Sequence, residues 1–207
     1  MNVKTLPAGL RRFSVTELAA EPWRNGGGQT RQIAARPQAD GDGWDWRVSL
    51  ADIQCDGPFS AFTGIDRQAV LAEGRQLTLR DPEGTMHFAH VGDRHAFDGA
   101  LALSAELAEG PARLFNVMTR RGRARAAVSV HQGKASLTMA SQSASLVLLV
   151  ASGEFLLHFC RPDSPAEIGL GLSRGEGLHI EGLQGRLDIE ALSLDACLLA
   201  AQLDYLA

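Results

Sequence analysis

Cysteine is scarce in this chain, and its spacing excludes two common ways of stabilising a small protein. The 207 residues include three cysteines, Cys55, Cys160 and Cys197. They are far apart, odd in number and never arranged as CxxC, so neither a zinc knuckle nor a disulfide framework is expected. A reducing compartment is the expected setting.

Long apolar runs are also missing. The longest, LVLLVA at residues 146–151, is far shorter than the roughly 20 residues that span a bilayer. The N-terminal run MNVKTLP lacks the apolar core of a signal peptide. We therefore expect a cytoplasmic protein with no membrane partner.

A strong excess of basic residues is missing as well. The chain has 20 Lys and Arg against 24 Asp and Glu, a net charge of -4 and a pI of about 5.9. This balance gives no sign of the positively charged surface that binds nucleic acid. The one basic cluster, RRGRAR at residues 120–125, alternates as a strand with one solvated face would, so no nucleic-acid partner is expected.

Short segments with period-two alternation dominate the chain and predict an all-β fold. In residues 44–53, Trp44, Trp46, Val48 and Leu50 alternate with polar or small residues. Similar strands are predicted at residues 68–72, 76–80, 100–107, 126–131, 135–139, 146–151, 154–159, 185–189 and 194–201. Many short strands at this spacing favour a β-sandwich or barrel. Only residues 15–20 and 198–206 also fit a short helix.

A weak internal repeat predicts two duplicated halves. The segment QAVLAEGRQLTL at residues 68–79 resembles LVLLVASGEFLL at residues 146–157, and each is followed by a Gly- and acid-rich segment around a histidine. This order fits two duplicated β-barrel halves, predicted at residues 1–120 and 121–207 and packed as one rigid unit. The alternative is that unrelated β-hairpins look alike.

Motifs for metal or cofactor chemistry are missing. The six histidines, at 87, 90, 95, 131, 158 and 179, never form His-x-His, the spacing that puts two rings on one strand face. No phosphate-binding glycine loop occurs. No metal or cofactor is expected, and an enzyme is less favoured than a binding protein. The remaining catalytic hypothesis uses His87, His90, His95 or Asp66 as general acid or base.

Polar residues beside turns and on strand faces predict a pocket for a small acid. Such groups are costly inside a barrel unless they are paired or bound, and arginine forks match carboxylates. The alternative is that each arginine is exposed or ion-paired. The predicted ligand contacts are Trp23, Arg24, Asn25, Arg47, Ser49, Phe62, Arg67 and Asn116, with Gly26, Gly27 and Gly28 shaping the loop.

Four sequence blocks resemble the HutD/Ves family. They are PWRNGGGQTRQIA at 22–34, WRVSLA at 46–51, GPFSAFTGIDR at 57–67 and NVMTRRG at 116–122. Gln32, Thr63 and Phe115 depart from the family's common residues, and Gln32 removes an acid. The resemblance implies a two-barrel cupin (bicupin) fold and a link to histidine utilisation, with a ligand such as urocanate or formylglutamate. It implies no enzymatic reaction.

The sequence therefore predicts a metal-independent bicupin that binds a small carboxylate and has a regulatory or homeostatic role. Two alternatives stay open: a cupin-type isomerase or hydrolase acting on a small acid, and a stress-related interaction module without a metabolite. A regulatory protein partner and a homodimer are further expectations.

Overall fold

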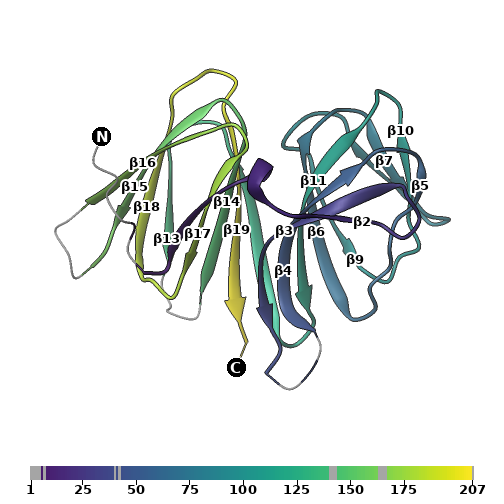
Figure 1. Cartoon of the computed structure of the whole chain (residues 1–207), viewed down its shortest axis with the longest axis horizontal. Helices are drawn as coiled ribbons and strands as arrows, with labels where there is room; N and C mark the ends of the chain where they lie inside the picture. The colour runs from purple at the N-terminus through teal and green to yellow at the C-terminus, as the bar shows by residue number, and fades with distance from the viewer. Residues whose placement is uncertain are drawn as a thin grey trace. The chain divides into compact units, whose positions relative to one another are not determined.

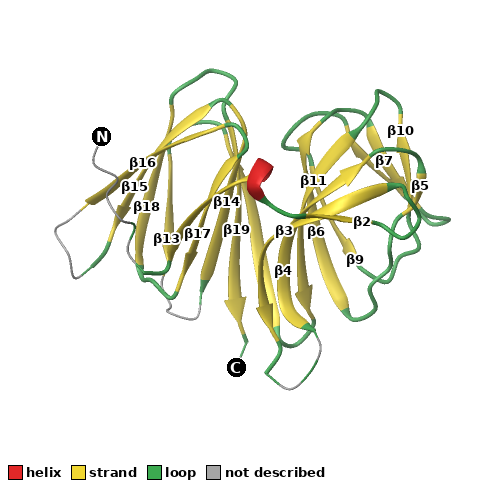
Figure 2. Cartoon of the chain, viewed as in Figure 1, coloured by secondary structure: helices red, strands yellow, loops and turns green. Residues whose placement is uncertain are grey.

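The computed structural model describes residues 6, 8–39, 41, 43–139, 144–162 and 167–206, and it is built almost entirely from β-strands. Figure 2 shows the strands in yellow and, in the described part of the chain, one short 3-10 helix in red, η1 (Val15–Glu17). The all-β prediction is confirmed. No helix in the described ranges is long and apolar enough to cross a membrane.

The chain divides into two compact units. Leu18–Val128 and Tyr205–Ala207 form the N-terminal unit, and Ser129–Asp204 forms the C-terminal unit together with Met1–Glu17. The early segment belongs to the later unit because its strand β1 pairs with β17, where Leu10 lies opposite Ile180. The division falls within β12, eight residues beyond the boundary expected from the repeat, between Val128 and Ser129.

Two sheets form the N-terminal unit (Figure 1). The six-stranded sheet has the order β2 (Ala20–Pro22), β3 (Gly28–Pro37), β4 (Trp44–Ile53), β11 (Ala112–Arg120), β6 (Ile65–Glu73) and β9 (Arg94–Asp98). The four-stranded sheet has the order β5 (Gly57–Pro58), β10 (Ser104–Leu107), β7 (Leu77–Arg80) and β8 (Thr85–Phe88).

Two sheets also build the C-terminal unit. The five-stranded sheet has the order β1 (Leu10–Ser14), β17 (Glu176–Glu181), β14 (Ser145–Ser152), β19 (Cys197–Tyr205) and β12 (Ala124–His131). The four-stranded sheet has the order β13 (Ala135–Met139), β18 (Gly185–Ala191), β15 (Glu154–Cys160) and β16 (Glu167–Ser173).

Each unit encloses an apolar core because alternate residues of its strands point inward. In the N-terminal unit this core includes Ala51, Leu71, Leu79 and Phe88. In the C-terminal unit, leucines and phenylalanines of β14, β15 and β17 take the same role. Burial of these side chains is the main favourable contribution to folding.

The repeat seen in the sequence corresponds to a repeated piece of structure. In the N-terminal unit, β6 and β7 follow one another across a glycine turn and belong to different sheets. In the C-terminal unit, β14 and β15 have the same arrangement. Each of these two strand–turn–strand segments therefore carries the chain from one sheet of its unit to the other.

One prediction of local structure is wrong. Residues 198–206 were a candidate helix, but they lie in and just beyond strand β19. Leu198, Leu199, Ala200 and Ala201 are all buried, and a run buried on both faces loses the alternation that marks a strand. In the other candidate, residues 15–20, the helical part is the short 3-10 turn η1.

Candidate functional site

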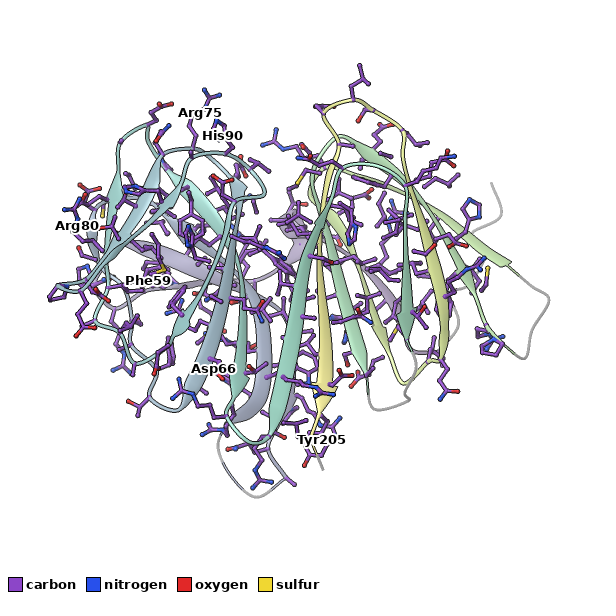
Figure 3. The ribbon with its side chains drawn as sticks, turned by 180° about the vertical axis from the view of Figure 1, so that it is seen from behind. Phe59, Asp66, Arg75, Arg80, His90 and Tyr205 are labelled. Carbon is purple, nitrogen blue, oxygen red and sulfur yellow. The ribbon has the colours of Figure 1, made fainter. Side chains whose placement is uncertain are left out.

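A cavity of about 140 Å³ lies within the N-terminal unit, between the six-stranded sheet and the segment that follows β5. Its lining is aromatic on one side and polar on the other. The lining residues are Trp23, Thr30, Arg47, Ala51, Phe59, Ser60, Phe62, Arg67 and Asn116. Ser60 is exposed, so the cavity reaches the surface there. Phe59, labelled in Figure 3, lies among the strands of this unit.

Strand register brings the two arginines of this cavity together. Residues directly opposite each other in an antiparallel pair share one face of the sheet. Arg47 on β4 lies opposite Met118 on β11, and Met118 lies opposite Arg67 on β6. The three side chains therefore form one row across the inner face. In the next row Ser49 lies opposite Asn116.

Arg67 is an almost fully buried cation. Only 3% of its surface is exposed. The guanidinium carbon lies 4.6 Å from the ring centre of Phe59, 5.1 Å from that of Phe97 and 5.6 Å from that of Phe62. Burial, together with the neighbouring Arg47 charge, lowers the pKa of Arg67 to about 10. The group still carries its charge near neutral pH, at an energetic cost that a bound anion would reduce.

Arg47 extends the same positive region. Its guanidinium carbon lies 5.3 Å from the ring centre of Trp44 and 5.8 Å from that of Phe62, and Nη2 donates to the sulfur of Met118 at 3.7 Å. Burial lowers the pKa of Arg47, and the charge of Glu21 opposes that shift. Thioether and aromatic contacts stabilise a guanidinium without neutralising it.

Several buried polar atoms around the cavity have no hydrogen-bond partner among the described residues. They are Nε of Arg47, Nε of Arg67, Oδ1 of Asn116 and Oγ of Ser49. An unsatisfied buried polar group costs about 1–3 kcal/mol. Within the described ranges, neither Arg47 nor Arg67 forms an ion pair with a carboxylate. The site therefore presents donors and positive charge that a ligand could satisfy.

The glycine loop before β3 shapes one wall of the cavity. Gly26 has a φ of 71°, a left-handed conformation that favours glycine. At Gly28, a Cβ atom would stand 2.1 Å from the carbonyl oxygen of Asp52, so the close approach of β3 and β4 requires glycine. The indole nitrogen of Trp23 donates to the hydroxyl of Thr30 at 2.8 Å, which fixes the ring at the cavity.

Hydrogen bonds tie the segment at residues 57–64 to the rest of the site. Nδ2 of Asn25 donates to the carbonyl oxygen of Pro58 at 3.1 Å, while Oδ1 of Asn25 accepts from the backbone of Gly27 at 3.0 Å. Nη1 of Arg67 donates to the carbonyl oxygen of Ser60 at 3.0 Å. Arg67 thus holds this segment while its Nε remains available to a ligand.

The structure brings together five of the eight predicted contact residues. Trp23, Arg47, Phe62, Arg67 and Asn116 line the cavity. The other three lie outside its lining: Arg24 is exposed, Asn25 bridges the two loops, and Ser49 is buried beside Asn116.

Sequence reasoning missed four lining residues as contacts. They are Thr30, Ala51, Phe59 and Ser60. Phe59 and Ser60 belong to the same sequence block as Phe62, and Thr30 lies two residues after the last of the three glycines. A search for small and aromatic residues beside the predicted arginines would have found them.

The candidate general acids and bases lie elsewhere. His87 is exposed and in hydrogen-bond contact with Thr78, His90 is exposed, and Nε2 of His95 lies 2.9 Å from the carbonyl oxygen of His87. Asp66 pairs with Arg121 at 2.7 Å, and Figure 3 labels it at the end of the unit opposite to His90. In the described part of the chain, no three His, Cys, Asp or Glu side chains meet as a metal site.

A second polar cluster lies on the same sheet, and its charges are paired. The carboxylate of Asp52 accepts hydrogen bonds from Arg113, from Arg31 at 3.2 Å and from Gln29 at 2.9 Å. Burial alone would raise the pKa of Asp52, but the bonds from Arg113, Gln29 and Arg31 together hold it below the usual value. Arg113 also pairs with Glu73 at 2.6 Å.

The fold and the cavity together define a class: a cupin-like all-β protein with a cationic pocket in its N-terminal unit. The fold resembles protein YlbA of Escherichia coli, with a TM-score of 0.67 at 10% identity over 97% of this chain and 93% of the other. The HutD family model matches residues 15–197, and the chain belongs to that family.

Relatives with known sequences or structures agree with this placement. Protein Ves of Citrobacter koseri is 39% identical over 122 residues, which are 57% of this chain and 62% of that protein, so the match spans less than two thirds of the relative. A conserved protein of unknown function from Pseudomonas aeruginosa PAO1 has a TM-score of 0.77 at 28% identity over 94% of this chain and 98% of the other. HutD from Pseudomonas fluorescens SBW25, solved in a formate condition, has a TM-score of 0.79 at 24% identity over 95% and 98%.

Proposed function

We propose that this protein binds a small carboxylate metabolite in the N-terminal cavity and serves a regulatory role in histidine utilisation. The observation that carries the proposal is the pair of half-buried Arg47 and buried Arg67, which share one row of the sheet and have no carboxylate partner among the described residues. A cation in such a place is costly unless an anion compensates it. The link to histidine utilisation rests on the family to which the chain belongs.

The cavity favours a small ligand that is bound rather than turned over. Its volume of about 140 Å³ equals the liquid volume of about five water molecules, which suits a compact acid such as urocanate and leaves part of formylglutamate at the mouth. The lining consists of arginine, asparagine, hydroxyl, small and aromatic residues. The histidines and Asp66 that could serve as general acid or base are not part of it.

Thermal unfolding and calorimetry with a panel of acids test the proposal. Purified protein is titrated with urocanate, formylglutamate, glutamate, formate, histidine and unrelated acids. A ligand at a hundredfold excess over its Kd should stabilise the protein by about 2.7 kcal/mol. Arg67→Met should strongly reduce the response, while Arg121→Ala, at an exposed ion pair, should retain it. An absence of any response to every acid would contradict the proposal.

A further inference from the structure

We propose that Glu21 determines which acids the cavity accepts, favouring those whose far end carries a cation or an N–H donor over those with a second carboxylate. The inference rests on the proposed function, because it concerns the far end of an acid whose carboxylate binds the two arginines. It assigns a selecting role to a residue at the rim of the site.

Strand register places Glu21 on the cavity side of the sheet. Glu21 on β2 lies opposite Thr30 on β3, and Thr30 lies opposite Ala51 on β4. Thr30 and Ala51 both line the cavity, and opposite residues share a face. Glu21 therefore extends the lining row by one strand. Since β2 is the edge strand and Glu21 is exposed, its carboxylate stands at the rim.

The charge of Glu21 reaches Arg47. Its carboxylate raises the pKa of Arg47, against the lowering effect of burial. The remaining lining carries no acidic side chain. Asp45, on the same face of β4 as Arg47 by alternation, is buried and is not part of the lining. The site thus has two positive charges within and one negative charge at its edge.

This distribution distinguishes the two ends of a ligand. A carboxylate compensates Arg67, which is 3% exposed. The cavity of about 140 Å³ is too small to enclose much more, so the other end of the acid extends toward the rim. A second carboxylate there is repelled by Glu21, whereas an ammonium, an imidazolium or an amide N–H is attracted. Interactions between exposed charges change affinity by about threefold to fivefold at low salt.

Three acids of matched length isolate the effect of the far end. Butanoate, 4-aminobutanoate and succinate are titrated into the intact protein by calorimetry at low and at high salt. For the unsubstituted chain we expect 4-aminobutanoate to bind about threefold to fivefold more tightly than butanoate, and succinate to bind more weakly than butanoate by a similar factor. High salt should reduce these differences in affinity, because it screens the charges.

Substitutions at Glu21 then test the assignment. Glu21→Gln should make the affinities for the three acids similar, and Glu21→Lys should make succinate the preferred acid. Glu109→Gln is the matched control, because Glu109 is an exposed acid that pairs with Arg75 at 3.6 Å and lies outside the lining. Thermal unfolding verifies that each variant is folded.

The outcomes separate this inference from the proposed function. If Arg67→Met weakens the binding of all three acids but Glu21→Gln leaves the order and ratios of their affinities unchanged, the pocket is supported and the role of Glu21 is overturned. A preference of the unsubstituted protein for succinate over butanoate also overturns it. If none of the acids binds, the proposed function fails and this inference fails with it.

Discussion

The two units fill their interiors with different side chains. In the C-terminal unit, Leu146 and Leu148 on β14 and Leu178 on β17 are fully buried in an apolar core. Its buried polar residues in the described ranges, Ser145 and His179, lie outside that core. In the N-terminal unit, the corresponding six-stranded sheet places two arginines, an asparagine and a serine on its inner face.

Under the proposed function, this difference separates a stable scaffold from a ligand site whose polar groups lower stability. Leucine in a β-sandwich core gains about 1.5–3 kcal/mol on burial, whereas an unpaired buried arginine costs free energy. One unit can therefore supply a stable scaffold while the other carries the polar groups. Buried polar residues without partners often mark functional sites for this reason.

The largest expected effect comes from placing an arginine in the apolar unit. Leu148→Arg should destabilise the protein by about 4 kcal/mol or more, because the new charge would be buried in an apolar core. Urea-induced unfolding measures the loss, and Leu148→Met serves as control, with an expected cost below about 1.5 kcal/mol. A stable Leu148→Arg variant would show that the two interiors are not as different as their side chains suggest.

The converse substitution should separate binding from stability. Arg67→Met should weaken binding of a carboxylate by about tenfold to a hundredfold, because a charge-assisted hydrogen bond contributes about 1.5–3 kcal/mol. The ligand-free protein should be as stable as the unsubstituted one or more so by about 1 kcal/mol. Calorimetry and thermal unfolding of the same samples test both parts. A large loss of stability without ligand would mean that Arg67 acts mainly by holding Ser60.

Paired arginines of the same sheet provide a third comparison. Asp52→Asn should reduce the free energy of unfolding by about 1–2 kcal/mol at pH 7, because Arg113 and Arg31 lose their shared carboxylate. The pKa of Asp52 is lowered in the folded protein, so its contribution is complete above the unfolded carboxyl value of about 4. It disappears as the pH falls through the lower folded value.

Unfolding curves at several pH values check this prediction. The difference between Asp52→Asn and the unsubstituted protein should be constant from neutral pH down to about pH 4 and should shrink below it. Ligand affinity should remain unchanged at pH 7, since Asp52 is not part of the cavity lining. A difference in stability that grows on acidification would contradict the assigned pairing.

The smallest effect is expected at Arg24. This residue is exposed and outside the lining, so Arg24→Ala should change affinity less than about twofold and stability by less than about 0.5 kcal/mol. Calorimetry with the acid that binds most tightly measures the first quantity. A tenfold loss of affinity would place the glycine loop in direct contact with the ligand, as the sequence predicted.

Local alternation was enough to predict the fold class. Trp44–Ile53 was predicted with the bounds of strand β4, because its apolar and polar residues alternate over ten positions. Buried strands without alternation were harder to predict, as β19 shows with five consecutive buried residues. Propensity and periodicity cannot separate such a run from a buried helix.

The site was only partly predictable because a single sequence does not specify which residues of neighbouring strands lie opposite each other. Arg47 and Arg67 are separated along the chain, and only the pairing of each with Met118 reveals that they share a row. The glycine loop also suggested that Arg24 and Asn25 contact a ligand. Both lie outside the cavity lining, and Asn25 bridges two loops. A loop can carry polar side chains to support its own conformation.

The pairing of β1 with β17 has a consequence for the order of events during synthesis. Leu10 and Phe13 are buried, and their strand lies opposite residues 176–180. The strands of Leu18–Val128 leave the ribosome early and can pair among themselves, but β1 precedes them and must wait until residues 176–180 have emerged. A nascent chain released before Glu176 would expose the apolar side of β1, a signal by which chaperones and proteases could recognise incomplete molecules.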